Sequence, residues 1–285
     1  MAKIVTIGLA LATLFAPALV QAQVQQPANV PYRYARDTPR NCVDRARFPQ
    51  FLERMKREAA AQGVGRRGIA ALNGLTFDED VISRDRGQKV FTQSFEEFSG
   101  RMVPPRVARA RSLMQKHAHL LSRIKHDFGV PPGLIVAIWG LETDFGGFLG
   151  NFPTMRAVAT LAYDCRRPEK FQPELIDLMK LVDRGDIDPA TAKGAWAGEI
   201  GQTQFMPSTF VKFAIDYDHD GKIDLVHSIP DVLGSTANFF KNNGWQPGQG
   251  WQPGQPNFQA ILQWNQAEVY ARTIAYFAQR LESGR

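Results

Sequence analysis

A single carboxylate, Glu142, lies in a segment that is otherwise suited to burial. Residues 134–141 are apolar on every side, with prolines before them and glycines after them, which predicts a buried helix over residues 132–145. Glu142 continues the apolar stripe of this helix at the spacing i, i+3, i+4 and i+7 set by Ile135, Ile138 and Trp139. Burial and the negative end of the helix both disfavour the charged carboxylate. We therefore expect a raised pKa for Glu142, which a general acid near neutral pH requires.

Two structural alternatives to this role remain open for Glu142. Neighbouring backbone groups can cap the carboxylate, or it can pair with an arginine such as Arg156. The other acid close to it along the chain is Asp144, which points to another side of the helix because residues two apart do not face each other. The sequence therefore indicates one isolated carboxylate rather than a pair.

A second group of residues has the spacing of a cation-binding loop. Oxygen donors alternate along it and Gly221 takes the sixth position, as in an EF-hand; the candidate ligands are Asp216, Asp218, Asp220, Lys222 and Asp224. The twelfth position holds His227 instead of the usual bidentate glutamate, and Asp231 is the candidate to complete the shell. We expect weak binding of a structural calcium ion, because one strong ligand is missing. The alternative is an acidic turn exposed to solvent.

The elements that position these residues are predominantly helical. Apolar residues recur at three- and four-residue intervals in segments that cover residues 48–62, 105–128, 132–145, 155–163, 169–183, 208–214, 230–243 and 265–281. Alternating strand patterns are scarce. The sequence predicts a mainly α fold of many short helices, with at most a minor hairpin.

The first residues of the chain are typical of an exported protein. Residues 1–22 combine Lys3, an apolar run and a small-residue cleavage site, which predicts a signal peptide. Pro17 interrupts the run, so we expect no membrane span, and no cysteine follows it to accept a lipid anchor. Residues 23–45 are rich in Gln, Pro and Arg without apolar periodicity, which predicts a mobile leader. We expect a periplasmic protein whose folded domain covers residues 46–283.

The two cysteines, Cys42 and Cys165, predict one disulfide, because an exported protein folds in an oxidising compartment. A bond between them would join the leader to the helical domain. Closing so long a loop would stabilise the fold by about 4 to 5 kcal/mol if the effect lies in the entropy of the unfolded chain.

One short repeat is present near the C-terminus. Six residues from Gly244 to Gln249 recur at once as residues 250–255, which predicts two Pro-Gly turns. We interpret the repeat as a solvent-facing loop that grew by duplication. The alternative is that Trp245 and Trp251 stack on carbohydrate.

Several motifs in one order give the chain a resemblance to a known family. The motifs are GLETDFG (140–146), AVATLAY (157–163), WAGEIGQTQFMPS (196–208) and NFFKNNGW (238–245). Together they resemble the membrane-bound lytic transglycosylase B family of murein-degrading enzymes, over residues 46–283. The resemblance implies a lysozyme-like helical fold with an additional helical subdomain and no required cofactor. It also implies non-hydrolytic cleavage of peptidoglycan between N-acetylmuramic acid and N-acetylglucosamine, which leaves a 1,6-anhydromuramoyl end.

The resemblance assigns roles to individual residues. Glu142 matches the catalytic acid and base, and the substrate-binding positions are Gln204, Phe205, Asn265, Tyr270 and Tyr163. The alternatives for these residues are ordinary helix capping and core packing. Ala195 stands where the family often has a serine, so one hydroxyl contact is absent. The resemblance also includes a calcium-type loop comparable to residues 216–224.

Two other functions remain open. A hydrolytic muramidase would use water, but hydrolysis usually needs a second carboxylate. A non-catalytic peptidoglycan-binding protein would use the cleft only for recognition. The net charge of +6 fits an anionic wall polymer or simply keeps the protein soluble, and the dispersed basic residues argue against nucleic acid.

Overall fold

The structure, a computed structural model, describes residues 43–87 and 93–284. The predicted signal peptide, most of the predicted leader and Cys42 lie outside the described residues. Residues 43–45, which we assigned to the leader, already belong to the fold. Asp44 caps the short 3-10 helix η1 (Arg45–Arg47) by accepting a 3.1 Å hydrogen bond from the Ala46 N–H.

Helices dominate the described residues, which confirms the mainly α prediction. The helices are α1 (Phe48–Ala61), α2 (Arg66–Ala70), α3 (Glu79–Arg86), α4 (Phe95–Met102), α5 (Pro104–Lys116), α6 (Ala118–Phe128), α7 (Pro132–Thr143), α8 (Thr154–Tyr163), α9 (Pro168–Arg184), α10 (Pro207–Phe213), α11 (Ile229–Asn242), α12 (Phe258–Trp264) and α13 (Glu268–Glu282). Strands β1 (Phe152–Pro153) and β2 (Lys193–Gly194) pair antiparallel, with Phe152 opposite Gly194.

The structure differs from the sequence prediction in three details. The predicted helix over residues 105–128 is two helices, because the backbone leaves the α region at His117 (φ −104°, ψ 22°). The two strands do not form a hairpin between neighbours, since a long segment containing α8 and α9 separates them. Helices α2, α3, α4 and α12 were not predicted, because they are too short, at five to eight residues, to show a clear helical period.

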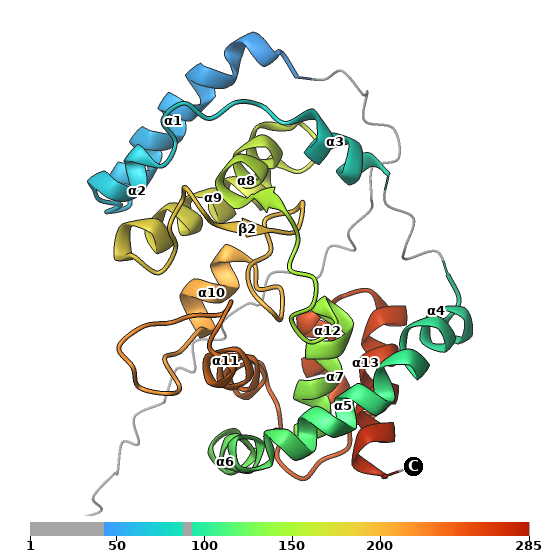
Figure 1. The fold of residues 1–285 in the computed structure, drawn as a ribbon. Helices are drawn as coiled ribbons and strands as arrows, with labels where there is room; N and C mark the ends of the chain where they lie inside the picture. The colour runs from blue at the N-terminus through green and yellow to red at the C-terminus, as the bar shows by residue number, and fades with distance from the viewer. Residues whose placement is uncertain (1–42, 88–92, 285) are drawn as a thin grey trace, which may run out of the picture. The chain divides into compact units, whose positions relative to one another are not determined.

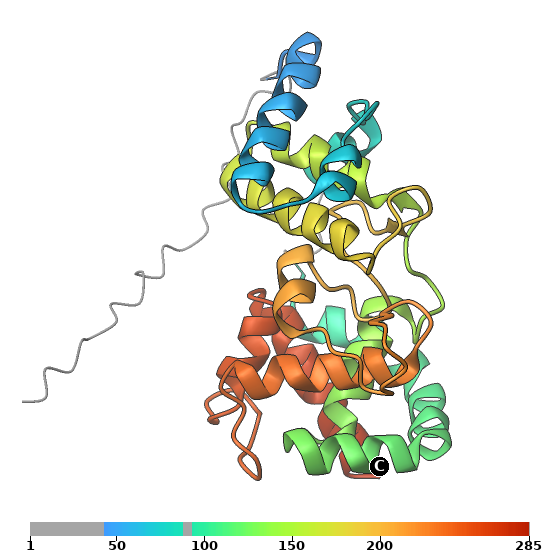
Figure 2. The ribbon, with the colours of Figure 1, turned by 90° about the vertical axis from the view of Figure 1, so that its left-hand side faces the viewer.

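The helices pack in two groups. One group has α9 at its centre, with α1, α2, α8 and α10 against it and α3 against α8. The other has α7 at its centre, with α5, α6, α11 and α13 against it, while α4 and α12 pack on α13. Figure 1 shows the first group around the α8 and α9 labels and the second around α7, and Figure 2 shows them turned by 90°. The smaller group around α9 matches the additional helical subdomain that the resemblance implied.

Helix α7 is the buried centre of the second group. Every residue from Gly133 to Leu141 is buried, as its continuous apolar sequence predicted. Proline at the first turn starts the helix, and Asp144 ends it in the left-handed conformation at φ 53°. A helix so enclosed gives the side chains of its last turn a fixed position.

The repeat near the C-terminus is largely exposed, as the prediction of a solvent-facing loop expects, and its two tryptophans anchor it to the helices. Trp245 is buried and donates a 3.0 Å hydrogen bond from Nε1 to the Gly129 carbonyl. Trp251 stacks on Trp245 at a centroid distance of 6.3 Å and donates from Nε1 to the Ala275 carbonyl. These contacts engage both indole N–H groups and bring the two rings against each other, so both tryptophans have a structural role.

Among residues 43–87 and 93–284, no helix combines the length and the apolar character that crossing a membrane requires.

Candidate active site

Glu142 lies in the last turn of α7, half-buried, and two aromatic side chains donate hydrogen bonds to it. Trp264 Nε1 lies 2.9 Å from Glu142 Oε1, and the Tyr270 hydroxyl donates a second hydrogen bond. Burial raises the pKa of Glu142 to about 7, the two hydrogen bonds oppose that rise, and the nearby charge of Glu199 adds to it. At neutral pH the carboxyl group can therefore both hold and release a proton, as acid and base catalysis requires.

Trp264 is held in place by other aromatic rings. It is the last residue of α12, and Phe240 of α11 stacks on it with centroids 5.7 Å apart and planes at 14°. Phe205 and Phe239 meet the same indole edge-on at 5.5 and 5.0 Å. Three rings from two segments of the chain thus fix the direction of one N–H bond, so the hydrogen bond to Glu142 is preorganised.

Tyr270 approaches Glu142 from the first turn of α13. Its ring is buried and lies 5.9 Å from the ring of Phe98 on α4. Burial and the carboxylate of Glu142 raise the pKa of Tyr270 well above its usual value, and the Arg106 charge opposes them. The phenol therefore remains protonated and acts as a hydrogen-bond donor.

Gln202 locks the end of α7 to the loop that follows β2. Its side-chain oxygen accepts a 2.8 Å hydrogen bond from Trp139 Nε1, and its Nε2 donates at 2.7 Å to the Val226 carbonyl. The hydroxyl of Thr143, next to Glu142, donates at 2.5 Å to the Gln202 carbonyl. Gln202 is only 7% exposed, so these bonds are shielded from water. Sequence reasoning selected Gln204 and missed Gln202, whose role depends on contacts between distant segments.

The two predicted residues of the same loop lie close to the site. Phe205 is fully buried against Trp264, as described above. Gln204 is half-buried and adopts a left-handed backbone with φ 56°, and its Nε2 donates to the Gly201 carbonyl at 2.8 Å. Gly201 has φ +75°, and a Cβ atom there would lie 2.3 Å from the Leu225 carbonyl oxygen. The tight turn therefore needs glycine at that position.

Asp144 is not available as a partner for Glu142. Its carboxylate pairs with Arg106 at 3.4 Å and with Arg109 at 3.3 Å, beyond the end of α7. The sequence prediction that it points to another side agrees with these contacts. Two guanidinium groups hold it as a helix-terminal ion pair.

Glu199 is a second carboxylate near Glu142 that sequence reasoning did not select. Burial raises the pKa of Glu199, and the backbone N–H groups and the charge of Lys170 oppose the rise. Its Oε2 is buried and has no hydrogen-bond partner among the described residues. The signal in the sequence was its place in the motif WAGEIGQ, directly before Gln202 and Gln204. An unpaired buried carboxylate atom is costly, so we regard Glu199 as a member of the site.

The structure does not bring the two remaining predicted residues to the Glu142 carboxylate. Asn265 is the C-cap residue of α12, and its Oδ1 accepts a 3.0 Å hydrogen bond from the Ala267 N–H in the turn before α13. Tyr163 ends α8, packs 4.9 Å from the ring of Phe51 and donates its hydroxyl to the Asp44 carbonyl at 2.6 Å. Both have the structural roles that were the alternatives for these residues, capping and packing, and their contact with substrate stays a prediction.

The acidic loop brings three carboxylates together. Oxygen atoms of Asp216, Asp218 and Asp231 lie within 4.8 Å of one another. Asp231 comes from the first turn of α11 and is 1% exposed, so it closes the loop from the protein side as the sequence suggested. Asp220 and Asp224 are not part of this group: Asp220 Oδ1 accepts the Lys222 N–H, and Asp224 Oδ2 lies 3.0 Å from His227 Nδ1. Three convergent carboxylates suit a hard divalent cation such as calcium.

The predicted disulfide joins Cys165 to a residue outside the described part. No cysteine within the described residues is free. The pairing of Cys165 with Cys42 stays a prediction.

The structure excludes the second alternative for Glu142, an ion pair with Arg156. Arg156 pairs with Asp78 at 2.8 Å, so it does not neutralise Glu142. The acid receives hydrogen bonds from two neutral side chains instead, which leaves its proton free to titrate. A lysozyme-like helical fold with one such acid at the end of a buried helix is what the resemblance to lytic transglycosylases implies.

Comparison with known proteins agrees with this class. Residues 47–255 match the family described as Transglycosylase SLT domain, and the chain belongs to this family. It is similar to the membrane-bound lytic murein transglycosylase B of Escherichia coli K12, at 36% identity over 52% of this chain and 41% of that protein. The chain therefore matches less than half the length of this relative.

Two solved structures show the same fold. Pseudomonas aeruginosa SltB3, in complex with NAG-anhNAM-pentapeptide, is 29% identical with a TM-score of 0.77 over 84% of this chain and 80% of that chain. Escherichia coli Slt35, in complex with calcium, is 25% identical with a TM-score of 0.71 over 85% and 94%. The fold that the resemblance implied is confirmed.

Proposed function

We propose that the protein is a lytic transglycosylase that cleaves the glycan strands of peptidoglycan without water. One observation carries the proposal: Glu142 has a pKa of about 7 and is held by two neutral donors, Trp264 and Tyr270. Asp144, its neighbour in sequence, is engaged by two arginines. A single acid that cycles between its two protonation states is what intramolecular ring closure needs.

In the proposed reaction Glu142 acts twice. It first gives its proton to the glycosidic oxygen between N-acetylmuramic acid and N-acetylglucosamine. The bond from C1 of N-acetylmuramic acid to this oxygen then breaks, N-acetylglucosamine leaves with a free C4 hydroxyl, and the N-acetyl group of the substrate stabilises the anomeric carbon. The resulting carboxylate then accepts the proton of the C6 hydroxyl, whose oxygen attacks C1 and closes the 1,6-anhydro ring. The hydrogen bonds from Trp264 and Tyr270 stabilise the carboxylate between these steps.

Hydrolysis is the second candidate, because Glu199 supplies another carboxylate near Glu142. A glycosidase with two carboxylates would activate water and leave reducing ends. Burial raises the pKa of Glu199 and the positive charges of Lys170 and Arg167 oppose that rise, so this carboxylate interacts with the α9 side of the site. We favour the transglycosylase reaction, since family membership and the Glu142 geometry agree on it.

The substrate and the location follow from the same proposal. The SltB3 structure contains a glycan with a pentapeptide, which supports peptidoglycan strands as the ligand class. The predicted signal peptide supports a periplasmic location without a membrane anchor. Gln204, Phe205, Asn265 and Tyr163 are retained as proposed substrate contacts, with Phe205 acting through Trp264.

The products test the proposal. Purified protein would be mixed with purified peptidoglycan, and the released fragments would be analysed by mass spectrometry with and without borohydride reduction. Anhydro ends, which borohydride does not reduce, are the expected result. Reducing ends would show a muramidase, and the absence of any released fragment would show a protein that only binds the wall.

We also propose a structural calcium ion on the acidic loop. Asp216, Asp218 and Asp231 offer convergent oxygen ligands, and the similarity to Slt35, solved in complex with calcium, supports that ion. The ion would connect the loop to α11 through Asp231. It would stabilise the fold and take no part in catalysis.

A further inference from the structure

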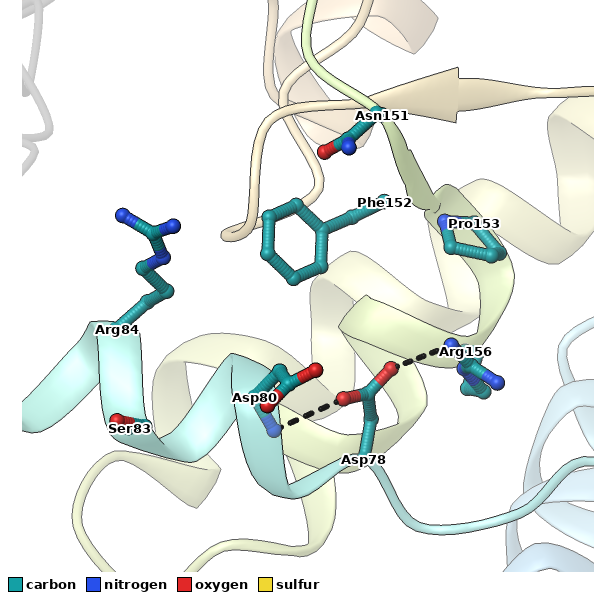
Figure 3. Close-up of a pocket in the computed structure, with 8 residues that line it drawn as sticks. All are labelled: Asp78, Asp80, Ser83, Arg84, Asn151, Phe152, Pro153 and Arg156. Carbon is teal, nitrogen blue, oxygen red and sulfur yellow. Dashed lines mark hydrogen bonds and ion pairs between the residues drawn. The ribbon is translucent and has the colours of Figure 1, made fainter.

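A cavity of about 640 Å³ lies away from the Glu142 carboxyl group, between α3, β1 and the start of α8. Its lining combines both signs of charge with one aromatic ring; the residues that the argument uses are Asp78, Asp80, Arg84, Asn151, Phe152 and Arg156. This volume is within the range of pockets that bind small organic ligands. Figure 3 shows the ring of Phe152 between the side chains of Arg84, Asp80 and Asn151.

Two of the charged side chains in this cavity form an ion pair with each other, and two do not. Asp78 and Arg156 neutralise each other at 2.8 Å, and Asp78 also caps α3 through the Asp80 N–H. The Arg84 guanidinium and the Asp80 carboxylate have no ion-pair partner among the described residues. One free cation and one free anion on successive turns of the same helix therefore face the cavity.

The wall that carries these two groups is firmly held. Asp85, next to Arg84, is buried and pairs with Arg166 at 2.6 Å, which ties α3 to the start of α9. The Asp78 N–H donates at 3.1 Å to the Thr160 hydroxyl of α8. Arg84 and Asp80 thus project from a fixed helix, which lowers the entropy cost of binding a ligand.

The opposite wall belongs to the segment that leaves the catalytic helix. Asn151 lies nine residues after Glu142, so the chain between them spans no more than about 30 Å. Within that segment Phe148 is 74% exposed, and strand pairing of Phe152 with Gly194 fixes the end of the segment. A single glycan strand with its attached peptides can therefore reach both Glu142 and the cavity.

We propose that this cavity binds the stem peptide of a peptidoglycan strand, an inference that rests on the proposed function. Arg84 would take a peptide carboxylate, Asp80 a free amine, and Phe152 an aliphatic side chain. A stem peptide that is not cross-linked offers all three groups, whereas the bare glycan offers no amine. The mixed lining is therefore better matched to the peptide than to sugar alone.

The experiment compares strands that carry stem peptides with strands from which an amidase has removed them. Arg84→Ala should lower the ratio of kcat/KM for peptide-bearing over peptide-free strands about fivefold, by loss of one charge-assisted hydrogen bond. Asp80→Asn should lower the ratio for stems with a free amine and leave the ratio for N-acetylated stems unchanged. Arg57→Ala, which removes an exposed arginine of α1, is the matched control and should leave the ratio unchanged.

An equal loss on both kinds of strand would overturn the inference and make the cavity a glycan subsite. An unchanged ratio in Arg84→Ala would also overturn it. The chemical form of the products, anhydro or reducing, reports separately on the proposed reaction. The two proposals can therefore fail independently.

Discussion

The indole N–H of Trp264 points at the carboxylate of Glu142, and the two atoms lie 2.9 Å apart across 122 residues of chain. This bond stabilises the ionised form and opposes the effect of burial on the pKa of Glu142. Acid catalysis requires the protonated form, so activity should fall as the pH rises through about 7. The position of that fall reports on the contacts of Glu142.

The first prediction concerns Trp264→Phe, which keeps an aromatic ring against Phe240 and removes the donor. We expect the alkaline fall in activity to move to higher pH, because the carboxylate loses a stabilising hydrogen bond. We also expect kcat to fall about tenfold, since the acid is less well positioned. The measurement is the pH dependence of kcat on purified peptidoglycan.

Trp251→Phe is the control for this variant. It removes an indole N–H that donates to the Ala275 carbonyl, away from Glu142. Its pH profile should match that of the wild type. If Trp264→Phe also kept the wild-type profile, the hydrogen bond to Glu142 would have no influence on the acid.

The second prediction concerns Glu199→Gln, which removes a negative charge that raises the pKa of Glu142. The alkaline fall in activity should therefore move to lower pH, the opposite direction to Trp264→Phe. Glu96→Gln removes an exposed carboxylate on α4 and should leave the profile in place. A shift of equal size in both variants would mean that net charge, rather than the position of Glu199, is responsible.

The third prediction concerns stability. Gln202→Ala leaves Trp139 Nε1 and the Val226 carbonyl without their partner, so the free energy of unfolding should fall by about 2 to 4 kcal/mol. Gln172→Ala, which removes one bond to the Ala162 carbonyl, should cost less than about 1 kcal/mol. Denaturant unfolding measures both. Similar losses of stability in the two variants would show that the hydrogen bonds of Gln202 to Trp139 and Val226 contribute no more than an ordinary side-chain hydrogen bond.

Local sequence patterns predicted helix α7 and its acid, whereas Tyr270 was assigned to the site only through the family resemblance. Helix α7 was evident because a continuous apolar run predicts its burial. Glu142 was then evident as the one carboxylate on its apolar stripe. The donors Trp264 and Tyr270 reach Glu142 only through the packing of α12 and α13, which no local pattern encodes. Glu199 was overlooked for the same reason, since its closeness to Glu142 is a tertiary contact.

Local sequence patterns also failed to predict where one helix ends and the next begins. The break at His117 involves neither glycine nor proline, so the periodicity of residues 105–128 continued across it. The spacing of the cation loop and the position of Asp231 were evident in the sequence, but only the fold shows that Asp220 and Asp224 accept hydrogen bonds from backbone groups and lie outside the convergent group of carboxylates. A carboxylate in such a loop can bind either an ion or a backbone N–H group, and the packing of the fold decides which of the two it binds.

The fourth prediction concerns the ion. Calcium should raise the melting temperature of the protein more than magnesium does, because an ion that binds only the folded state stabilises it. Asp218→Asn should lose most of that increment. Asp188→Asn, in an exposed turn, should keep all of it. An increment that survives in Asp218→Asn would place the ion elsewhere.

The fifth prediction is the effect of Glu142→Gln on stability. The folded protein holds this proton up to a pH of about 7, whereas the unfolded chain releases it near 4.5, the usual pKa of a glutamate. As the pH rises between these values the wild type loses stability, because only the folded state retains the proton. Above pH 7 the glutamine variant should be more stable than the wild type by roughly 1 to 3 kcal/mol. A variant less stable than the wild type at pH 8 would contradict the burial of this charge.

The activity of the same variant is the most direct test of the central claim. Glu142→Gln and Asp144→Asn would be compared with the wild type on purified peptidoglycan at neutral pH, by counting anhydromuropeptides with mass spectrometry. The account predicts a loss of about 100-fold or more in Glu142→Gln, with glycan binding intact, and a much smaller loss in Asp144→Asn. A Glu142→Gln enzyme that releases anhydromuropeptides at nearly the wild-type rate would contradict it.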